Sequence, residues 1–253
     1  QQCFNFSFLS SPWSKDSLQG VIARSYEVNN GVGAPTTWVF NNHDVVRLPS
    51  RMGLERTGKG PNGIYATDPQ PDFVLGTRRA QAAQLLMLAL PGSAYLYNGE
   101  ELGLPEHTSL PDEARQDPTF FRTKGEEAGR DGCRIPLPWV SAEPGAGFSP
   151  TGETWLPQPD GWSGFAVDVQ DNDPDSSLNF LRKPLALRSQ YGLGTSGIDD
   201  QSTDTTLDYL VGDIRVITTF DDEADRPEGW RVVLSSTPVT NTIGTDTTVW
   251  LVR

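Results

Sequence analysis

Apolar and polar residues follow one pattern up to about residue 200 and another after it. In the first part, short apolar runs are each followed by a pattern with helical spacing. The runs Cys3–Leu9, Thr36–Phe40 and Ser93–Tyr97 predict strands, and the spacing of apolar residues predicts helices over 14–22 and 77–90. Strands that alternate with helices are typical of a parallel α/β fold.

The second pattern consists of strands separated by turns rich in Gly, Asp and Pro. A last helix is expected to start near Asp175, capped by Asp175 or Ser176. We therefore expect an α/β domain over residues 1–192 and an antiparallel β-sandwich over residues 205–253. The strands predicted in the second domain are Leu207–Val211, Ile214–Phe220, Trp230–Ser235 and Thr247–Val252.

The predicted α/β domain has too few strands for a complete barrel. A (β/α)₈ barrel needs eight strands and roughly 250 residues, whereas three strands are predicted here before the β-rich part. The chain also opens on Gln1 instead of Met. We therefore expect a preceding part of the barrel, and with it the natural N-terminus, to be missing. The longest apolar run, Leu85–Leu90, is too short to span a bilayer.

Charge and cysteine content narrow the choice of partner. The formal net charge is −13, which argues against nucleic acids and anionic membranes, because both are held by clustered Lys and Arg. A neutral or small partner fits better. The only cysteines, Cys3 and Cys133, lack the spacing of a metal site or a disulfide framework, and we expect two buried free thiols.

Candidate chemistry lies directly after the second predicted strand. Asn42, His43 and Asp44 follow the apolar run that ends at Phe40, and active sites of parallel barrels lie at the C-terminal ends of the strands. His and Asp together offer a donor and a charged acceptor for sugar hydroxyls. Asn and Asp at this place could equally satisfy the backbone of a turn, and the local pattern alone leaves both interpretations open.

Several motifs, in the right order, resemble the α-amylase superfamily, glycoside hydrolase family 13. The run 42–44 after Trp38-Val39-Phe40 is similar to a conserved region that closes the seventh barrel strand in this family. Residues 90–103, at the eighth strand, and the loop over residues 129–139 are further matches to the family. Residues 155–159 and the helix expected around residues 178–188 resemble the continuation in bacterial α-glucosidases. The resemblance covers nearly the whole chain.

The resemblance implies roles for four residues. Asp44 matches the third catalytic carboxylate, which binds hydroxyls of the sugar in subsite −1 and favours its oxocarbenium-like form. His43 matches the neighbouring donor to the same sugar, and Arg134 matches an arginine that closes the far side of this pocket. Arg47 is expected either to line the pocket wall or to serve only as an ion-pair partner.

The resemblance also implies what the chain lacks. In the family the nucleophile and the acid end strands four and five, whereas this chain is expected to begin at strand six. Glu100 and Glu101 do not replace them, because neighbours on an extended chain point to opposite sides, and we interpret them as a structural turn. His107 is expected to be solvated.

The expected fold is therefore strands six to eight of a (β/α)₈ barrel followed by a β-sandwich. The expected function of the whole protein is retaining hydrolysis of terminal α-linked glucose in maltose-type oligosaccharides, in the cytoplasm, without cofactor or metal. Val45 mildly favours maltose-type linkages. The chain alone should be inactive. The alternatives are a glucosyl-transferring relative of the trehalose synthase or sucrose isomerase type and a non-catalytic amylase-like module.

Overall fold

A computed structural model describes residues 3–253, which gather into two compact units. The first unit contains the residues up to Phe40 together with Thr77–Tyr95 and Arg182–Arg253, and the second contains Asn41–Gly76 and Leu96–Leu181. Both units are therefore assembled from separate stretches of the chain. The domains expected from the sequence, over residues 1–192 and 205–253, are a different division of the chain. They stay a prediction about the whole protein.

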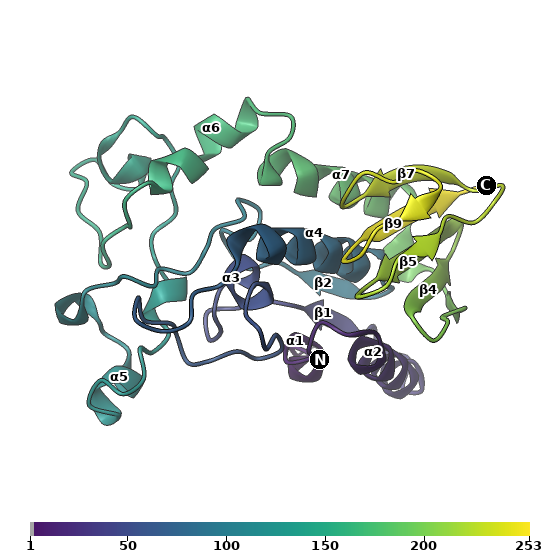
Figure 1. The fold of residues 1–253 in the computed structure, drawn as a ribbon, viewed down its shortest axis with the longest axis horizontal. Coiled ribbons are helices and arrows are strands. Elements are labelled where there is room, and N and C mark those ends of the chain that lie inside the picture. The colour runs from purple at the N-terminus through teal and green to yellow at the C-terminus, as the bar shows by residue number, and fades with distance from the viewer. Residues whose placement is uncertain (1–2) are drawn as a thin grey trace. The chain divides into compact units, whose positions relative to one another are not determined.

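A short parallel sheet in the first unit joins two of the predicted strands. In this sheet β1 (Thr37–Val39) pairs with β2 (Ser93–Tyr95), with Trp38 opposite Ala94. The Trp38 side chain is fully buried, and its indole N–H donates to the carbonyl oxygen of Pro91 at 2.6 Å. The helix α2 (Lys15–Asn30) precedes β1, as predicted (Figure 1). The expected parallel pairing of these two segments is confirmed.

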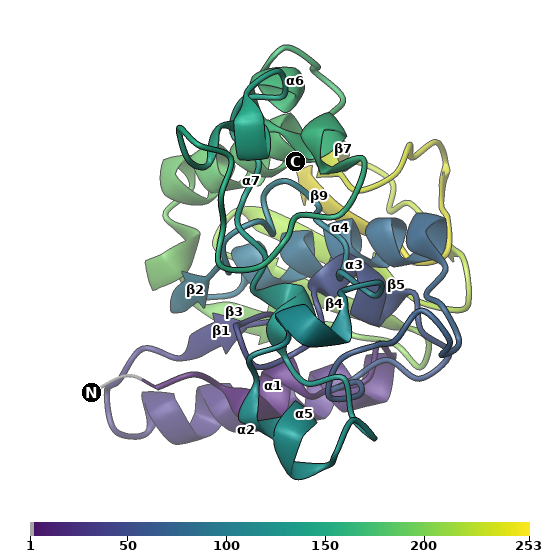
Figure 2. The ribbon, with the colours of Figure 1, turned by 90° about the vertical axis from the view of Figure 1, so that its left-hand side faces the viewer.

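The expected strand over Cys3–Leu9 is wrong. This stretch contains a short helix, α1 (Phe6–Leu9), and Asn5 caps it by accepting the backbone N–H of Phe8 at 3.1 Å. A short apolar run fits a buried strand and a buried helical turn equally well, and here the capping Asn decides between them. The chain turns so that Phe8 is buried against Trp38, whereas Phe6 is 57% exposed. Figure 2 shows α1 beside β1.

Five of the strands from residue 198 onward form one antiparallel sheet in the first unit. Its order is β3-β4-β5-β9-β7, and all its pairings are antiparallel. The four predicted strands are confirmed, and β3 was not predicted. A separate antiparallel pair joins β6 (Ala224–Asp225) to β8 (Thr242–Ile243). The bounds are β3 (Ile198–Asp200), β4 (Thr206–Val211), β5 (Ile214–Thr219), β7 (Arg231–Ser235) and β9 (Thr248–Val252).

The long helix α4 (Phe73–Ala89) contacts strand β9 of this sheet (Figure 1). The Trp250 indole N–H donates to the carbonyl oxygen of Leu85 at 3.1 Å, and the Thr248 hydroxyl donates to that of Ala82 at 2.8 Å. Both side chains are fully buried. These bonds fix the helix on the sheet through polar groups that burial would otherwise leave unsatisfied. No helix in the described part of the chain is both long and apolar enough to cross a membrane.

The second unit consists mainly of loops and short helices. The helix α7 (Ser177–Gln190) starts in it, and the Ser176 hydroxyl accepts the Asn179 backbone N–H at 3.2 Å, so one of the two expected caps is confirmed. Pro184 lies inside this helix. The short helices are α3 (Leu48–Met52), α5 (Pro118–Arg122), α6 (Val167–Asp171), η1 (Asp112–Ala114), η2 (Asp131–Cys133), η3 (Pro144–Gly147) and η4 (Trp162–Phe165); η5 (Leu193–Thr195) follows α7.

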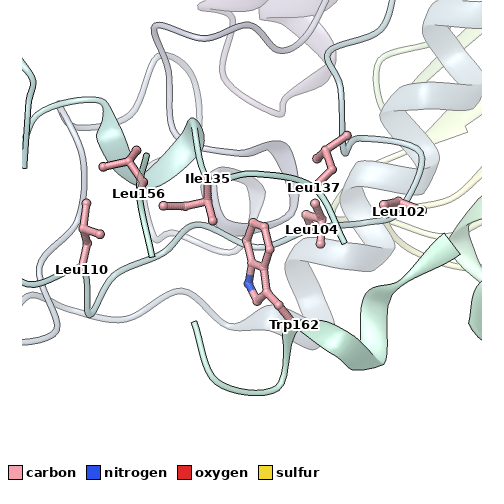
Figure 3. Close-up of a cluster of buried hydrophobic side chains, with 7 residues drawn as sticks. All are labelled: Leu102, Leu104, Leu110, Ile135, Leu137, Leu156 and Trp162. Carbon is pink, nitrogen blue, oxygen red and sulfur yellow. The ribbon is translucent and has the colours of Figure 1, made fainter. Parts of the chain in front are cut away.

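A hydrophobic cluster holds the loops of the second unit together, because regular secondary structure is sparse there. Side chains from segments up to 60 residues apart converge in it around the indole of Trp162, which is 3% exposed (Figure 3). Two of them, Ile135 and Leu137, directly follow Arg134, so the cluster anchors the end of the loop that carries this arginine. The buried members are Leu102, Leu104, Leu110, Ile135, Leu137, Leu156 and Trp162.

Candidate active site

The segment that follows β1 forms a tight polar turn in the second unit. Asn41 and Asn42 are buried, and the Asn42 side-chain oxygen accepts the backbone N–H of Asp44 at 2.8 Å. An Asn that binds the backbone two residues further on imitates a backbone turn and fixes the following side chain. The Asp44 side chain is 42% exposed, so the turn presents a carboxylate to solvent.

Two arginines bind the same oxygen of the Asp44 carboxylate. Arg130 Nη1 lies 2.6 Å from Asp44 Oδ1, and Arg134 Nη2 lies 3.2 Å from that oxygen. His43 Nε2 lies 3.6 Å from Oδ2, which is too long for a hydrogen bond. No other residue of the described chain donates to Oδ2. This oxygen is therefore open to a ligand hydroxyl.

The same two arginines share a second, buried carboxylate. Asp117 Oδ2 accepts from Arg130 Nε at 2.6 Å and from Arg134 Nη1 at 3.3 Å. Burial alone would raise the pKa of Asp117, but its hydrogen bonds from Arg130 and Thr119 outweigh burial and hold that pKa at about 2. The carboxylate therefore stays charged at neutral pH.

Arg134 is also fixed to the turn. Its Nε donates to the carbonyl oxygen of His43 at 2.9 Å, and its own carbonyl oxygen accepts the indole N–H of Trp155 at 3.3 Å. Three residues singled out in the sequence, His43, Asp44 and Arg134, are thus brought together, although 90 residues separate Asp44 from Arg134. The expectation that these two converge is confirmed.

Arg47 lies outside this cluster. Its side chain is buried, Nη1 donates to the carbonyl oxygen of Asn98 at 3.0 Å, and its guanidinium carbon lies 5.5 Å and 5.6 Å from the ring centroids of Tyr97 and Trp162. Within residues 3–253 it forms no ion pair with Asp44. The geometry is that of a cation packed between two aromatic rings.

Two titratable groups lie buried behind the loop that carries Arg130 and Arg134. Burial raises the pKa of Glu106 to about 7, although its bond from the Arg47 backbone N–H acts in the opposite direction. His107 is 5% exposed, and burial lowers its pKa to about 4. The expectation of a solvated His107 is wrong, because its backbone N–H is bound to the carbonyl oxygen of Gly132 and the segment turns inward.

The other sequence expectations at this site have mixed outcomes. Glu100 and Glu101 do belong to a turn, since their carboxylates accept the backbone N–H groups of Tyr97 and Gly99. Cys133 is a buried free thiol as expected, but Cys3 is exposed. No group of three His, Cys, Asp or Glu side chains arranged for a metal ion is found in the described part of the chain.

Sequence reasoning missed Arg130 and Asp117. One signal for Asp117 was available, because Asp followed by Pro is typical of a helix start, and Asp117 does cap α5 by accepting the Thr119 N–H at 2.7 Å. That signal predicts a cap only. Nothing in the local pattern indicates that the other oxygen of this carboxylate binds two arginines.

The family model "Alpha amylase, catalytic domain" matches residues 11–197. The chain belongs to the alpha-amylase family. Among curated members, a probable alpha-glucosidase of Rhizobium meliloti is 33% identical over 186 residues, which are 74% of this chain and 30% of that protein. The oligo-1,6-glucosidase of Parageobacillus thermoglucosidasius is 25% identical over 75% of this chain and 33% of its own length. The chain thus spans about a third of these relatives.

Solved structures of family members agree with the fold. The alpha-glucosyl transfer enzyme XgtA superposes with a TM-score of 0.73 and 27% identity, covering 99% of this chain and 46% of XgtA. The trehalose-6-phosphate hydrolase of Bacillus licheniformis gives a TM-score of 0.73 at 22% identity, over 99% of this chain and 51% of its own. At 22% identity, the similarity to the trehalose-6-phosphate hydrolase concerns the fold alone.

Proposed function

We propose that the Asp44 cluster is the sugar-binding part of the active site of a retaining α-glucosidase that acts on maltose-type oligosaccharides. The observation that carries the proposal is that the two oxygens of the Asp44 carboxylate differ in their contacts. Oδ1 of Asp44 is held by Arg130 and Arg134, and Oδ2 is open on a side chain that is 42% exposed. A carboxylate fixed at one oxygen and free at the other can bind a sugar hydroxyl without losing its orientation.

The chemistry follows from the charge. Cleavage of a glycosidic bond passes through an oxocarbenium-like transition state, and hydrogen bonds to sugar hydroxyls that strengthen there contribute several kcal/mol. In the proposal Asp44 accepts such a hydroxyl and its negative charge stabilises the positive charge that develops on the ring. His43, whose side chain is 61% exposed, is a second donor to the same sugar, and Arg134 closes the pocket. Arg47 supports the pocket wall from within the core.

The proposal assigns the nucleophile and the general acid to a part of the whole protein outside this chain. It is supported by the share of the curated relatives that the chain spans, about a third. The parallel strands β1 and β2 would be the seventh and eighth barrel strands. The five-stranded sheet and the β6–β8 pair would form the C-terminal β-sandwich.

The test uses the whole protein, with maltose for activity and p-nitrophenyl α-glucoside for stereochemistry, because the latter releases glucose only from the cleaved bond. Proton NMR of the anomeric signals during the first turnovers on the nitrophenyl glucoside should show α-glucose appearing before mutarotation produces the β anomer, because a retaining enzyme inverts the anomeric carbon twice. Initial release of β-glucose from this substrate would contradict the retaining mechanism. An absence of glucose release from maltose and longer α-glucosides would contradict the function.

A glucosyl-transferring activity is the second candidate, and the 27% identity with the alpha-glucosyl transfer enzyme XgtA favours it. The side chains of the Asp44 cluster would serve both reactions, since hydrolysis and transfer differ only in the acceptor. Product analysis at high maltose or sucrose concentration distinguishes them. Longer or rearranged glucosides would dominate in a transferase, and free glucose would dominate in a hydrolase.

A further inference from the structure

A closed ring of hydrogen bonds joins Asp44 to Arg130, Asp117 and Arg134. Arg130 bridges Asp44 and Asp117 through Nη1 and Nε, with 2.6 Å at each contact. Arg134 bridges the same two carboxylates through Nη2 and Nη1, at 3.2 Å and 3.3 Å. Each arginine therefore donates one hydrogen bond to the exposed carboxylate of Asp44 and one to the buried carboxylate of Asp117.

We propose that Asp117 is a positioning residue that keeps Oδ2 of Asp44 free for substrate. This inference rests on the proposed function of Asp44 and adds a role for a residue that does not touch the sugar. A guanidinium left to itself prefers to bind a carboxylate with two parallel bonds, one to each oxygen. Asp117 takes one nitrogen donor from each arginine, and each arginine then binds Asp44 through a single nitrogen, at Oδ1, which leaves Oδ2 uncovered.

The surrounding structure fixes the position of the Asp117 carboxylate. Its side chain is fully buried, and Oδ1 is held by the Thr119 N–H, so only Oδ2 faces the arginines. Asp131 fixes the backbone behind it, because one Asp131 oxygen accepts the N–H groups of Gln116 and Asp117 at 2.7 Å and 2.8 Å. Gly129 adopts a φ of 74°, and a Cβ there would lie 2.9 Å from Asp117 Cβ, so a larger residue would displace the carboxylate.

Charge balance leads to the same conclusion. Two arginines and two aspartates sum to zero, and the carboxylate of the buried aspartate stays ionised. Without the charge of Asp117 the ring would carry a net positive charge beside the place where an oxocarbenium ion develops. Positive charge at that point opposes the transition state more than the neutral ground state. The loss should therefore appear in kcat and only weakly in KM.

The test is Asp117→Asn in the whole protein, with maltose as substrate. Asparagine keeps the oxygen that caps α5 and removes the charged acceptor for the arginines. We expect kcat to fall about 10-fold or more, with KM within about 3-fold of the wild-type value. Asp168→Asn is the matched control, because Asp168 also accepts a backbone N–H and a hydroxyl, both from Ser141, but forms no ion pair with an arginine among residues 3–253. Its kcat should stay at the wild-type value.

A double variant separates positioning from a general structural role. If Asp117 acts largely through Asp44, then Asp117→Asn should lower the residual kcat of Asp44→Asn by a smaller factor than it lowers the kcat of the wild type, whereas a structural effect independent of Asp44 would lower both by the same factor. Should Asp117→Asn fail to fold, Arg130→Lys tests the same ring, because a single ammonium cannot divide its donors as a guanidinium does. Arg130 is 33% exposed, so folding should tolerate this change, and kcat should again fall.

The failure of this inference is distinguishable from the failure of the proposed function. A wild-type protein that releases glucose, with Asp117→Asn or Arg130→Lys above half of its kcat, would overturn the positioning role alone. Fully multiplicative losses in the double variant would do the same. A wild-type protein without activity on α-glucosides would overturn both.

Discussion

Two aspartates, one in each unit, are each held by two arginines, and their surroundings differ. Asp246, in the first unit, is 5% exposed at its side chain; Arg79 and the Trp13 indole bind Oδ1, and Arg78 binds Oδ2, at 2.7 to 3.0 Å. Asp44, in the second unit, is 42% exposed and has only Oδ1 occupied.

The difference indicates what each carboxylate does. Asp246 is buried with both oxygens satisfied and lies outside the proposed sugar site, so we assign it a structural role, since removing it would take away the acceptor that two arginines share. An exposed carboxylate with one oxygen satisfied is fixed in place but still has binding capacity. We therefore expect substitutions at Asp44 to affect turnover and substitutions at Asp246 to affect stability.

The largest effect is expected for Asp44→Asn in the whole protein. The substitution keeps the shape of the side chain but removes the charge that stabilises the transition state. We expect kcat on maltose to fall about 10³-fold or more, equivalent to about 4 kcal/mol. Steady-state kinetics measure this loss. Thermal unfolding should be almost unchanged, because the side chain is partly solvated, and near-normal turnover would show that Asp44 is only structural.

Asp246→Asn should give the opposite result. Removing the charge of the buried Asp246 weakens the bonds that it accepts from Arg78, Arg79 and Trp13, and should cost about 2 kcal/mol. Urea denaturation followed by tryptophan fluorescence measures the change in unfolding free energy. The kcat of the protein that remains folded should equal that of the wild type. A variant with full stability and reduced kcat would reverse the comparison.

The role of Asp44 could be predicted from the sequence and that of Asp117 could not, for a physical reason. Polar residues that directly follow a buried strand can be recognised locally, and the family motif adds a role to them. The bond from Arg130 to Asp44 joins residues 86 positions apart, and only the folded chain shows it. His107 illustrates the same limit, because its burial depends on a contact with the distant Gly132.

The fold could be predicted where turn residues clearly bound the apolar runs. The strands after residue 200 are separated by turns of Gly, Asp and Pro, and four were found from the sequence with bounds that differ by a residue. The run Cys3–Leu9 fits a strand and a helical turn equally well, so a capping Asn5 could turn it into the helix α1. Most of the second unit could not be predicted, because its loops are held by a cluster of side chains from distant segments.

A third carboxyl group, Glu106, sharpens the comparison because it is buried and forms no ion pair within residues 3–253. Its pKa of about 7 exceeds the ordinary value, so the folded state binds the proton more tightly than the unfolded state. This contribution to stability is complete below pH 4.5 and is lost as the pH rises through 7. Glu106→Gln should therefore gain stability relative to the wild type, by about 2 kcal/mol between pH 5 and 7.

Chemical denaturation at several pH values measures that difference. His107 titrates in the opposite sense, since its lowered pKa of about 4 makes stability fall as the pH drops from 6.5 to 4. Both proteins contain His107, so its contribution cancels in the difference between them. A difference that does not vary between pH 5 and 7 would show that Glu106 is not protonated in the folded protein at the lower pH.

The smallest effect is expected for the ring N–H donor beside each aspartate. His43 Nε2 lies 3.6 Å from Asp44 Oδ2 on an exposed side chain, whereas the Trp13 indole donates to Asp246 at 2.7 Å in the core. His43→Ala should lower kcat/KM on maltose about 10-fold, since one hydrogen bond to the sugar is lost, and should leave the unfolding free energy unchanged. Trp13→Phe should cost about 1 kcal/mol of stability at unchanged kcat/KM. If His43→Ala instead destabilised the protein and spared catalysis, the turn after β1 would be a structural feature like the Asp246 site.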